Sequence, residues 1–290
     1  MRDLRLDEFV VLEDGARQEV KHLWQELDVP LTVGLVADVS GSQNGFIAEH
    51  REKIIQFLAR VMAPRDQAFL VSVTKQQTLI TDLTGSGDEL RAGAVRLGVE
   101  QGAALGDPCA GNDDTPSNRS MRRRGAPCGG TALWNGVYYS AKLKLRPQPR
   151  RKAMLILTDG WDTGSDHGLA DAIEACQSAD TVVYTIRYRI APPPFVASPI
   201  VFIRLRNRSA RAKRDLEAIS LHTGGLAFNS QKDEFLDILA RIETDLRSQY
   251  ILAYKPSAAR KPEGYRKIEV TVTRPGLMVR ARKGYYGEEH

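Results

Sequence analysis

The chain lacks the features that define several common protein classes. No stretch approaches the roughly 18 consecutive apolar residues of a membrane-spanning helix, so we predict no transmembrane segment. Residues 1–10 lack the apolar core of a secretory signal peptide, so we expect no targeting segment in this chain. With only 3 cysteines in 290 residues, the sequence also excludes a small disulfide-rich scaffold.

Sequence motifs of catalytic sites are missing too. The chain contains no Gly-x-Ser-x-Gly nucleophile motif, no His-Glu-x-x-His zinc motif, no Walker phosphate loop and no dinucleotide-binding fingerprint. None of its 5 histidines lies in a motif with the spacing of metal ligands. We therefore predict that the protein is not an enzyme, with a magnesium-dependent hydrolase as the alternative.

Negative charge does not balance positive charge, because 41 Lys and Arg residues face 36 Asp and Glu residues and give a formal net charge of +5. The basic residues are concentrated in clusters at residues 119–124, 146–152 and 204–213. Such clusters could attract nucleic acid. They contain no interleaved aromatic residues on which bases could stack, so solvated loops are the preferred interpretation and nucleic-acid binding is the alternative.

The three cysteines are predicted to have different roles. Cys109 and Cys128 bracket a polar segment rich in Gly, Asn, Pro and Arg, and a disulfide between them would close this loop. Such a bond would contribute about 3 kcal/mol and would imply an oxidising compartment. Neither cysteine has a partner at zinc-finger spacing. Cys176 falls in a predicted helix and is interpreted as a small buried apolar residue.

The middle of the chain alternates between strand and helix patterns. Residues 31–37 form an almost continuous apolar run, which is typical of a strand buried on both faces of a parallel sheet. Further strands are predicted at 153–157 and 181–187, and helices with 3.6-residue periodicity at 46–62 and 233–247. This alternation predicts an α/β fold with a doubly wound, mostly parallel central sheet flanked by helices.

Both ends of the chain differ from the middle. Residues 9–13 and 17–24 are predicted as strands joined by a Glu13-Asp14-Gly15 turn. We predict that this N-terminal hairpin, residues 1–28, packs with a C-terminal β module of residues 249–290. The α/β domain, residues 29–248, would then be inserted within a small β module, with inserts of its own at about 100–128 and 190–212. Strands are also predicted at residues 200–205, 265–273 and 277–283.

Oxygen-bearing side chains stand at three predicted element boundaries. Asp38, Ser40 and Ser42 follow the first buried strand. Thr131 precedes a predicted helix, and Asp159 follows the end of the second central strand. Because parallel strands deliver their carboxyl ends to one edge of a sheet, where ligands bind in open α/β folds, we expect these side chains to converge there.

Two carboxylates and three hydroxyl groups make a donor set suited to a hard cation. Oxygen ligands favour Mg²⁺, with Mn²⁺ or Ca²⁺ as alternatives, over zinc or copper. The two aspartates would neutralise a divalent ion and leave room for an acidic group from outside. Each piece alone is more typical of a turn or a helix cap, and only their combination predicts a metal site. Asp162 and Asp166 could hold a second ion, although a solvated loop is the preferred interpretation.

The residues Asp38, Ser40, Ser42, Thr131 and Asp159 resemble the metal-ion-dependent adhesion site of von Willebrand factor type A (VWFA) domains. In that family Asp-x-Ser-x-Ser, a distant Thr and a distant Asp hold Mg²⁺ in a type A, Rossmann-like fold. The resemblance implies that the hydroxyls bind the ion directly and that a Glu or Asp carboxylate of a protein partner completes the shell. The function it implies is metal-dependent adhesion, protein–protein interaction or scaffolding.

Longer stretches resemble a bacterial VWFA-related group common in acidobacteria. They cover almost the whole chain and comprise residues 11–15, 158–164, 248–252, 274–277 and 283–286. Members of this group often carry an export signal. The resemblance therefore implies a periplasmic, cell-surface or secreted protein.

Overall fold

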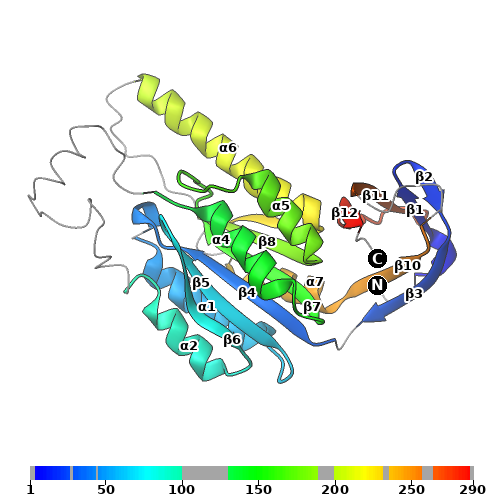
Figure 1. Cartoon of the computed structure of the whole chain (residues 1–290), viewed down its shortest axis with the longest axis horizontal. Coiled ribbons are helices and arrows are strands. Elements are labelled where there is room, and N and C mark those ends of the chain that lie inside the picture. The colour runs from blue at the N-terminus through cyan, green and yellow to red at the C-terminus, as the bar shows by residue number, and fades with distance from the viewer. Residues whose placement is uncertain are drawn as a thin grey trace, which may run out of the picture.

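The structure is a computed structural model that describes residues 4–26, 29–43, 45–99, 130–188, 199–230, 235–256 and 264–287 of the chain. These residues form two parts, which lie side by side (Figure 1). The larger part, here called the α/β body, runs from the first central strand to the last helix. The smaller part, the β unit, contains strands from both ends of the chain. No described helix is long and apolar enough to cross a membrane.

The α/β body is built on a six-stranded sheet with the strand order β6-β5-β4-β7-β8-β9. All neighbouring strands pair in parallel except the edge strand β6, which joins β5 antiparallel. The strand order turns back between β4 and β7, which creates the switch point where open α/β sheets bind ligands. The strands are β4 (Leu31–Asp38), β5 (Gln67–Val73), β6 (Gln77–Thr84), β7 (Arg151–Thr158), β8 (Thr181–Tyr188) and β9 (Ala227–Ser230).

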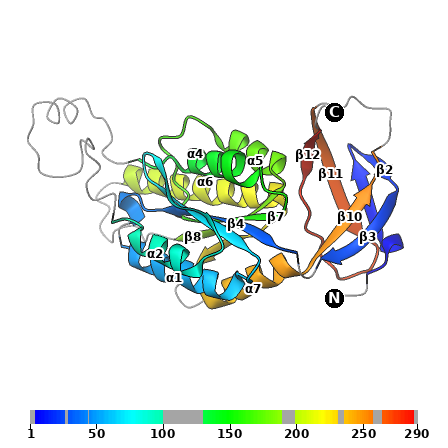
Figure 2. The same ribbon diagram turned by 60° about the horizontal axis from the view of Figure 1, so that its bottom comes forward.

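Helices cover both faces of this sheet (Figure 2). One face packs against α1 (Ile47–Val61), α2 (Gly87–Arg96) and α7 (Phe235–Arg247). The other face packs against α4 (Leu133–Tyr139), its π-helical continuation Ser140–Leu145, α5 (Leu169–Ser178) and α6 (Pro199–Thr223). This doubly wound, mostly parallel arrangement confirms the predicted fold class.

The central strands divide their side chains between two cores. Along β4, Val33 and Leu35 join the core under α1 and α7, whereas Val36 joins the core under α4 and α5. On β7, Leu155 and Ile156 divide in the same way. Since successive strand residues point to opposite faces, a strand covered on both sides must be apolar throughout. This requirement explains the unbroken apolar run at residues 31–37.

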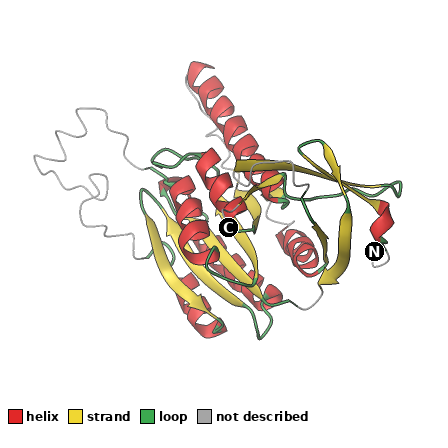
Figure 3. Cartoon of the chain, turned by 45° about the vertical axis from the view of Figure 1, so that its right-hand side comes forward, coloured by secondary structure: helices red, strands yellow, loops and turns green. Residues whose placement is uncertain are grey.

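The β unit joins the two ends of the chain. It has a four-stranded sheet in the order β12-β11-β1-β2 and a two-stranded sheet of β10 and β3, visible as strands beside the helical part in Figure 3. Asp14 and Gly15, at φ 47° and 84°, form the two-residue hairpin turn between β1 and β2. The strands are β1 (Phe9–Glu13), β2 (Ala16–Gln18), β3 (Val20–Glu26), β10 (Gln249–Tyr254), β11 (Gly264–Val272) and β12 (Gly284–Gly287).

A buried carboxylate holds the middle of the β unit. Glu13 on β1 is 3% exposed, and its Oε1 accepts a hydrogen bond from Arg266 Nη1 at 2.9 Å. Its Oε2 accepts from Tyr254 Oη at 2.6 Å and from Tyr285 Oη at 3.1 Å. These three donors come from β10, β11 and β12, so one side chain connects β1 with all three C-terminal strands.

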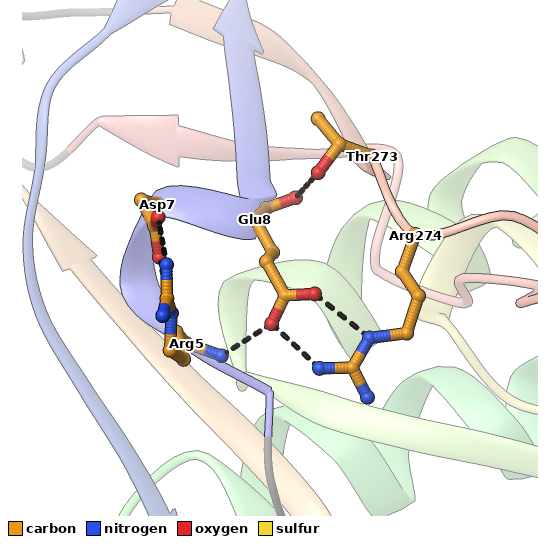
Figure 4. Close-up of polar contacts among 5 residues, drawn as sticks. All are labelled: Arg5, Asp7, Glu8, Thr273 and Arg274. Atoms are coloured by element: carbon orange, nitrogen blue, oxygen red, sulfur yellow. Dashed lines mark hydrogen bonds and ion pairs between the residues drawn. The ribbon is translucent and has the colours of Figure 1, made fainter.

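A second contact joins the ends of β1 and β11. Glu8, the last residue of the 3-10 helix η1 (Leu6–Glu8), accepts two hydrogen bonds from the Arg274 guanidinium at 2.7 and 2.9 Å (Figure 4). Its carboxylate also accepts the Arg5 backbone N–H at 2.8 Å. A two-pronged arginine–carboxylate pair fixes orientation as well as charge, so this contact aligns the start of β1 with the end of β11.

The segment between β11 and β12 attaches the β unit to the α/β body. Lys283 N donates to His222 O at 3.0 Å, at the end of α6. Arg282 pairs with Asp180 at 2.6 Å, and Arg280 pairs with Asp245 on α7. Lys283 O accepts from Ile268 N on β11 at 2.8 Å, but no ladder of backbone hydrogen bonds along residues 277–283 is described. The strand predicted at residues 277–283 is wrong for that reason, and β12 begins only at Gly284.

A second secondary-structure prediction is also wrong. Residues 200–205 are not a strand but belong to α6, which continues without a break from Pro199 to Thr223. The β-branched residues of this run suggested a strand, yet Ala212, Leu216 and Ile219 recur at helical spacing and are buried against the body. The basic cluster 204–213 therefore lies on a helix and not in a solvated loop. The domain boundaries remain predictions, and the whole insert predicted at 100–128, with Cys109 and Cys128, lies outside the described residues.

Candidate metal site

Asp38 is the last residue of β4 and lies at the carboxyl edge of the sheet, fully buried. Its Oδ1 accepts a hydrogen bond from Ser40 N at 2.9 Å, which folds the following loop back over the strand end. Ser42 lies within the short 3-10 helix η2 (Gly41–Gln43) that follows. The Ser40 and Ser42 hydroxyl oxygens lie 3.1 Å apart as a result. The Asp-x-Ser-x-Ser segment thus presents its oxygens from one tight loop.

Asp159 follows β7, the strand that pairs with β4. Because Ala37 lies opposite Leu157 in this pairing, the ends of the two strands meet. Thr158 Oγ1 donates to Asp38 Oδ2 at 2.7 Å, which joins them directly. Asp159 is 3% exposed, and its Oδ1 accepts from Trp161 N at 2.9 Å. Its Oδ2 is buried and has no hydrogen-bond partner among the described residues.

The electrostatics of the two carboxylates are unfavourable without a cation. Burial raises the pKa of Asp38 to about 7, and repulsion from the nearby Asp159 carboxylate adds to the rise. Hydrogen bonds from Ser40 and Thr158 oppose this shift but do not cancel it. A buried carboxylate pair with one unpaired oxygen is the environment in which a divalent cation supplies the missing charge.

Thr131 lies just before α4 and is 5% exposed. Its backbone N donates to Thr163 Oγ1 at 3.0 Å, and its carbonyl accepts from Thr163 N and Gly164 N at 2.9 and 3.1 Å. The next residue, Ala132, donates its N–H to Thr74 O after β5 at 2.6 Å. Thr131 is therefore attached both to the loop that carries Asp159 and to the end of a central strand.

A glycine allows α4 to approach the sheet closely enough for this attachment. A Cβ atom on Gly136 would lie 2.5 Å from Val73 Cγ2. Any other residue at 136 would force either the Val73 side chain or α4, which follows Thr131, to shift. The position of Thr131 at the rim thus depends on a glycine inside the helix.

Several side chains hold the loop 161–168 against α4 and were not anticipated from the sequence. Asp162 Oδ1 accepts from Ser165 Oγ at 2.5 Å and from Trp134 N at 3.3 Å, so it caps the start of the helix. Asn135, 6% exposed, accepts at its Oδ1 the backbone N–H groups of Asp166 and His167, at 3.1 and 3.0 Å. A polar residue in the apolar pattern of α4 was the available signal for this role.

The donor set fits a hard divalent cation. Ser40 contacts both Asp38 and Ser42, Asp159 lies close enough to shift the Asp38 pKa, and Thr131 is attached to the Asp159 loop. Among the described residues, no three His, Cys, Asp or Glu side chains cluster as metal ligands. The set is one of two carboxylates and hydroxyl groups, which favours Mg²⁺ over softer metals. That these five residues bind a metal remains a prediction.

Sequence comparison finds no matching protein-family model and no similar protein among curated sequences. Structure comparison finds proximal thread matrix protein 1 of the mussel byssus, with a TM-score of 0.53 and 13% identity over 81% of this chain and 51% of that chain. The same mussel protein with a zinc-occupied MIDAS, the metal-ion-dependent adhesion site, has a TM-score of 0.52 and 12% identity over 81% and 50%. An aerotolerance-related membrane protein of Bacteroides fragilis has a TM-score of 0.50 and 15% identity over 74% and 98%.

These likenesses define the class of fold. The α/β body has the fold of a von Willebrand factor type A domain, as the sequence resemblance implied. The chain spans about half the length of the mussel protein. At these identities the comparison concerns the fold and not the activity.

Proposed function

We propose that the protein binds a divalent cation, Mg²⁺ by preference, through Asp38, Ser40, Ser42, Thr131 and Asp159. The observation that carries the proposal is the buried pair Asp38 and Asp159, in which one carboxylate oxygen has no partner among the described residues and the Asp38 pKa is raised to about 7. A bound cation would remove both penalties. The zinc-occupied site of the mussel protein shows that this fold can hold a divalent ion at a MIDAS.

The bound ion would capture a partner rather than catalyse a reaction. Two aspartates neutralise a divalent ion and the hydroxyls add no charge, so the ion remains attractive to a further carboxylate. A Glu or Asp side chain of a protein partner is the ligand this chemistry selects. We therefore propose metal-dependent adhesion or scaffolding as the function. An exported location, in the periplasm, at the cell surface or outside, is the setting that we propose for it.

The metal part of the proposal is tested by Asp38→Asn. With Mg²⁺ at about 100 times its Kd, the wild-type protein should gain about 2.7 kcal/mol of stability, seen as a rise in Tm. Asp38→Asn should weaken Mg²⁺ binding at least about tenfold, measured by calorimetric titration. Because the change removes a buried charge next to Asp159, the metal-free variant should melt no lower than the metal-free wild type.

Asp88→Asn is the matched control, because Asp88 is an exposed aspartate on α2, away from the rim. This variant should keep the full response to Mg²⁺. Unchanged Mg²⁺ binding by Asp38→Asn would contradict the assignment of the site.

A further inference from the structure

The N-terminal half of α6 is exposed and projects from the α/β body (Figures 1 and 3). Towards the end of the helix Ala212, Leu216 and Ile219 are buried against the body. Before Ala212, the described side chains are exposed except for Leu205 and Ser209, which are half-buried. We call residues 200–214 the arm. A helix that leaves its body in this way presents most of its circumference to solvent.

The C-terminal part of the arm contacts the rim that carries the candidate metal site. The Arg208 guanidinium lies 4.2 Å from the ring centre of Trp161, two residues after Asp159. Arg187 Nε donates to Asp159 O at 3.0 Å, and its Nη2 donates to Ser209 Oγ at 2.7 Å. Gly160 adopts φ +85°, and a Cβ there would lie 3.1 Å from Ala212 O. The Asp159 loop is thus fixed directly against the arm.

The charge of the arm is strongly one-sided. Residues 200–214 contain no Asp or Glu and six basic residues, namely Arg204, Arg206, Arg208, Arg211, Lys213 and Arg214. Arg211 and Lys213 have carboxylates 3.5 Å away, at Asp215 and Glu217. Among the described residues, Arg204, Arg206 and Arg214 have no carboxylate within ion-pair distance. A positive surface of this kind attracts an acidic ligand and raises its rate of association.

We propose that the arm docks an acidic polypeptide segment of the partner whose carboxylate binds the metal. The inference rests on the proposed function, because the metal site supplies the first contact and the arm extends it. The partner is then a protein with several Asp or Glu residues near the one that reaches the ion. Exposed Ile200, Phe202 and Ile203, at 64%, 45% and 51%, add apolar area for this contact.

The distribution of side chains around the arm favours a polypeptide over a membrane surface. A helix that lies on a lipid surface separates an apolar face from a basic face. On the arm, Arg204 and Arg211 follow Ile200 at spacings of 4 and 11 residues, which return to the same side of the helix. Arg214 follows Ile203 at a spacing of 11 residues in the same way. Apolar and basic side chains are therefore mixed, as in a protein interface.

The test uses the whole chain and poly-L-glutamate as the acidic probe, with Mg²⁺ or with EDTA. The variant R204E/R206E/R214E reverses three exposed charges that make no described ion pair. It should bind the probe in Mg²⁺ about tenfold or more weakly than the wild type, with a weaker dependence on NaCl. The control R17E/R91E/K255E reverses three exposed charges away from the arm and should change the affinity less than about twofold.

Three results distinguish this inference from the proposed function. Equal binding of the probe by the arm variant and the wild type would contradict the proposed role of the arm without contradicting the proposed metal site. Loss of binding in the arm variant, with no effect of EDTA or of Asp38→Asn, would support the arm and overturn the metal site. Arm-dependent binding to phosphatidylserine vesicles or to duplex DNA, with no binding of poly-L-glutamate, would also overturn the proposal. Mg²⁺ titration of the arm variant should match the wild type, which checks its folding.

Discussion

His50 is a buried histidine in the core next to the rim. It lies on α1, is fully buried, and its ring centre is 4.3 Å from that of Tyr188 on β8. Neither of its ring nitrogens has a hydrogen-bond partner among the described residues. Burial lowers the pKa of His50 to about 4, Lys53 lowers it further, and Glu49 opposes the change. The folded protein therefore holds this histidine in its neutral form.

The lowered pKa predicts a loss of stability in acid that His50→Phe removes. As the pH falls below about 6.5, His50 becomes protonated in the unfolded chain, whereas in the folded chain it stays neutral until about pH 4. Between pH 7 and 4 the variant should gain up to about 3 kcal/mol relative to the wild type, measured by urea unfolding at each pH. Any packing cost of Phe is a constant offset and does not mimic this trend.

The measured quantity is the difference in unfolding free energy between the variant and the wild type, because Asp38 changes the stability of both proteins with pH in the opposite direction to His50. The raised pKa of Asp38 makes the metal-free protein lose stability as the pH rises from about 4 to about 7. His22→Phe changes an exposed histidine on β3 and should show a constant offset from the wild type. A constant offset for His50→Phe as well would contradict the prediction.

At the residue scale, the sequence identified the candidate ligands but not the side chains that position them. Asp38 and Asp159 follow apolar strands, and polar residues at such boundaries stand out in the pattern. Asn135 and Thr163 act through hydrogen bonds to backbone groups that become neighbours only after folding. No local pattern encodes such a contact. The prediction for Cys176 is confirmed, because it is fully buried and burial raises its pKa to about 12.

At the scale of elements, Asp66 connects three elements at one end of the α/β body. It is 2% exposed, its Oδ1 accepts from Leu31 N at 2.7 Å, and its Oδ2 accepts from Ala63 N at 2.8 Å. It also pairs with Arg247 at the end of α7. One carboxylate therefore connects the start of β4, the end of α1 and the last helix.

Asp66→Ala should destabilise the protein by about 3 kcal/mol, because it leaves two backbone N–H groups without their acceptor and the half-buried Arg247 without its carboxylate partner. The measurement is the free energy of unfolding in urea at neutral pH. Asp82→Ala removes an aspartate whose side chain is 65% exposed and which pairs with Lys144, and it should cost less than about 1 kcal/mol. Similar costs for the two variants would show that the buried network contributes little.

The elements of the body could be predicted because their apolar periods are long and clear. The two errors have physical causes that a local pattern does not contain. The run 200–205 is rich in β-branched residues, but the helix forms because its later turns bury Ala212, Leu216 and Ile219 against the body. The segment 277–283 has an extended pattern, but its arginines pair with Asp180 and Asp245 of the body, and only Lys283 makes described backbone hydrogen bonds, to His222 and Ile268.

At the scale of the whole molecule, the two parts have unequal cores. Among the described residues, the buried apolar cluster of the β unit contains only Val11, Val20 and Ile268, whereas the body has two large clusters. The β unit therefore depends more on its polar contacts, above all on Glu13. Sequence periodicity predicted strands at both ends of the chain, but no pattern within a strand specified that β1 would pair with β11.

Glu13→Ala should loosen the β unit and leave the body intact. The change leaves the Arg266 guanidinium and the hydroxyls of Tyr254 and Tyr285 without their shared acceptor. Hydrogen exchange measured by mass spectrometry should show at least about tenfold faster exchange in β1 and β11, with β4 and β7 unchanged. Glu269→Ala, which removes an exposed carboxylate from the same sheet, should leave both rates as in the wild type. Equal acceleration in β4 would mean that the two parts unfold as one.

The antiparallel pairing in the β unit also determines how the molecule would respond to mechanical force. Phe9 lies opposite Val272 at one end of β11, and Gly287 lies opposite Gly264 at the other end. Tension between residues 4 and 287 would pull β1 and β12 in opposite directions along β11, so that the ladder hydrogen bonds share the load in shear. The chain enters and leaves the α/β body through β3 and β10, which pair with each other. The rim that carries Asp38 would thus stay unloaded until the pairing of these two strands was broken.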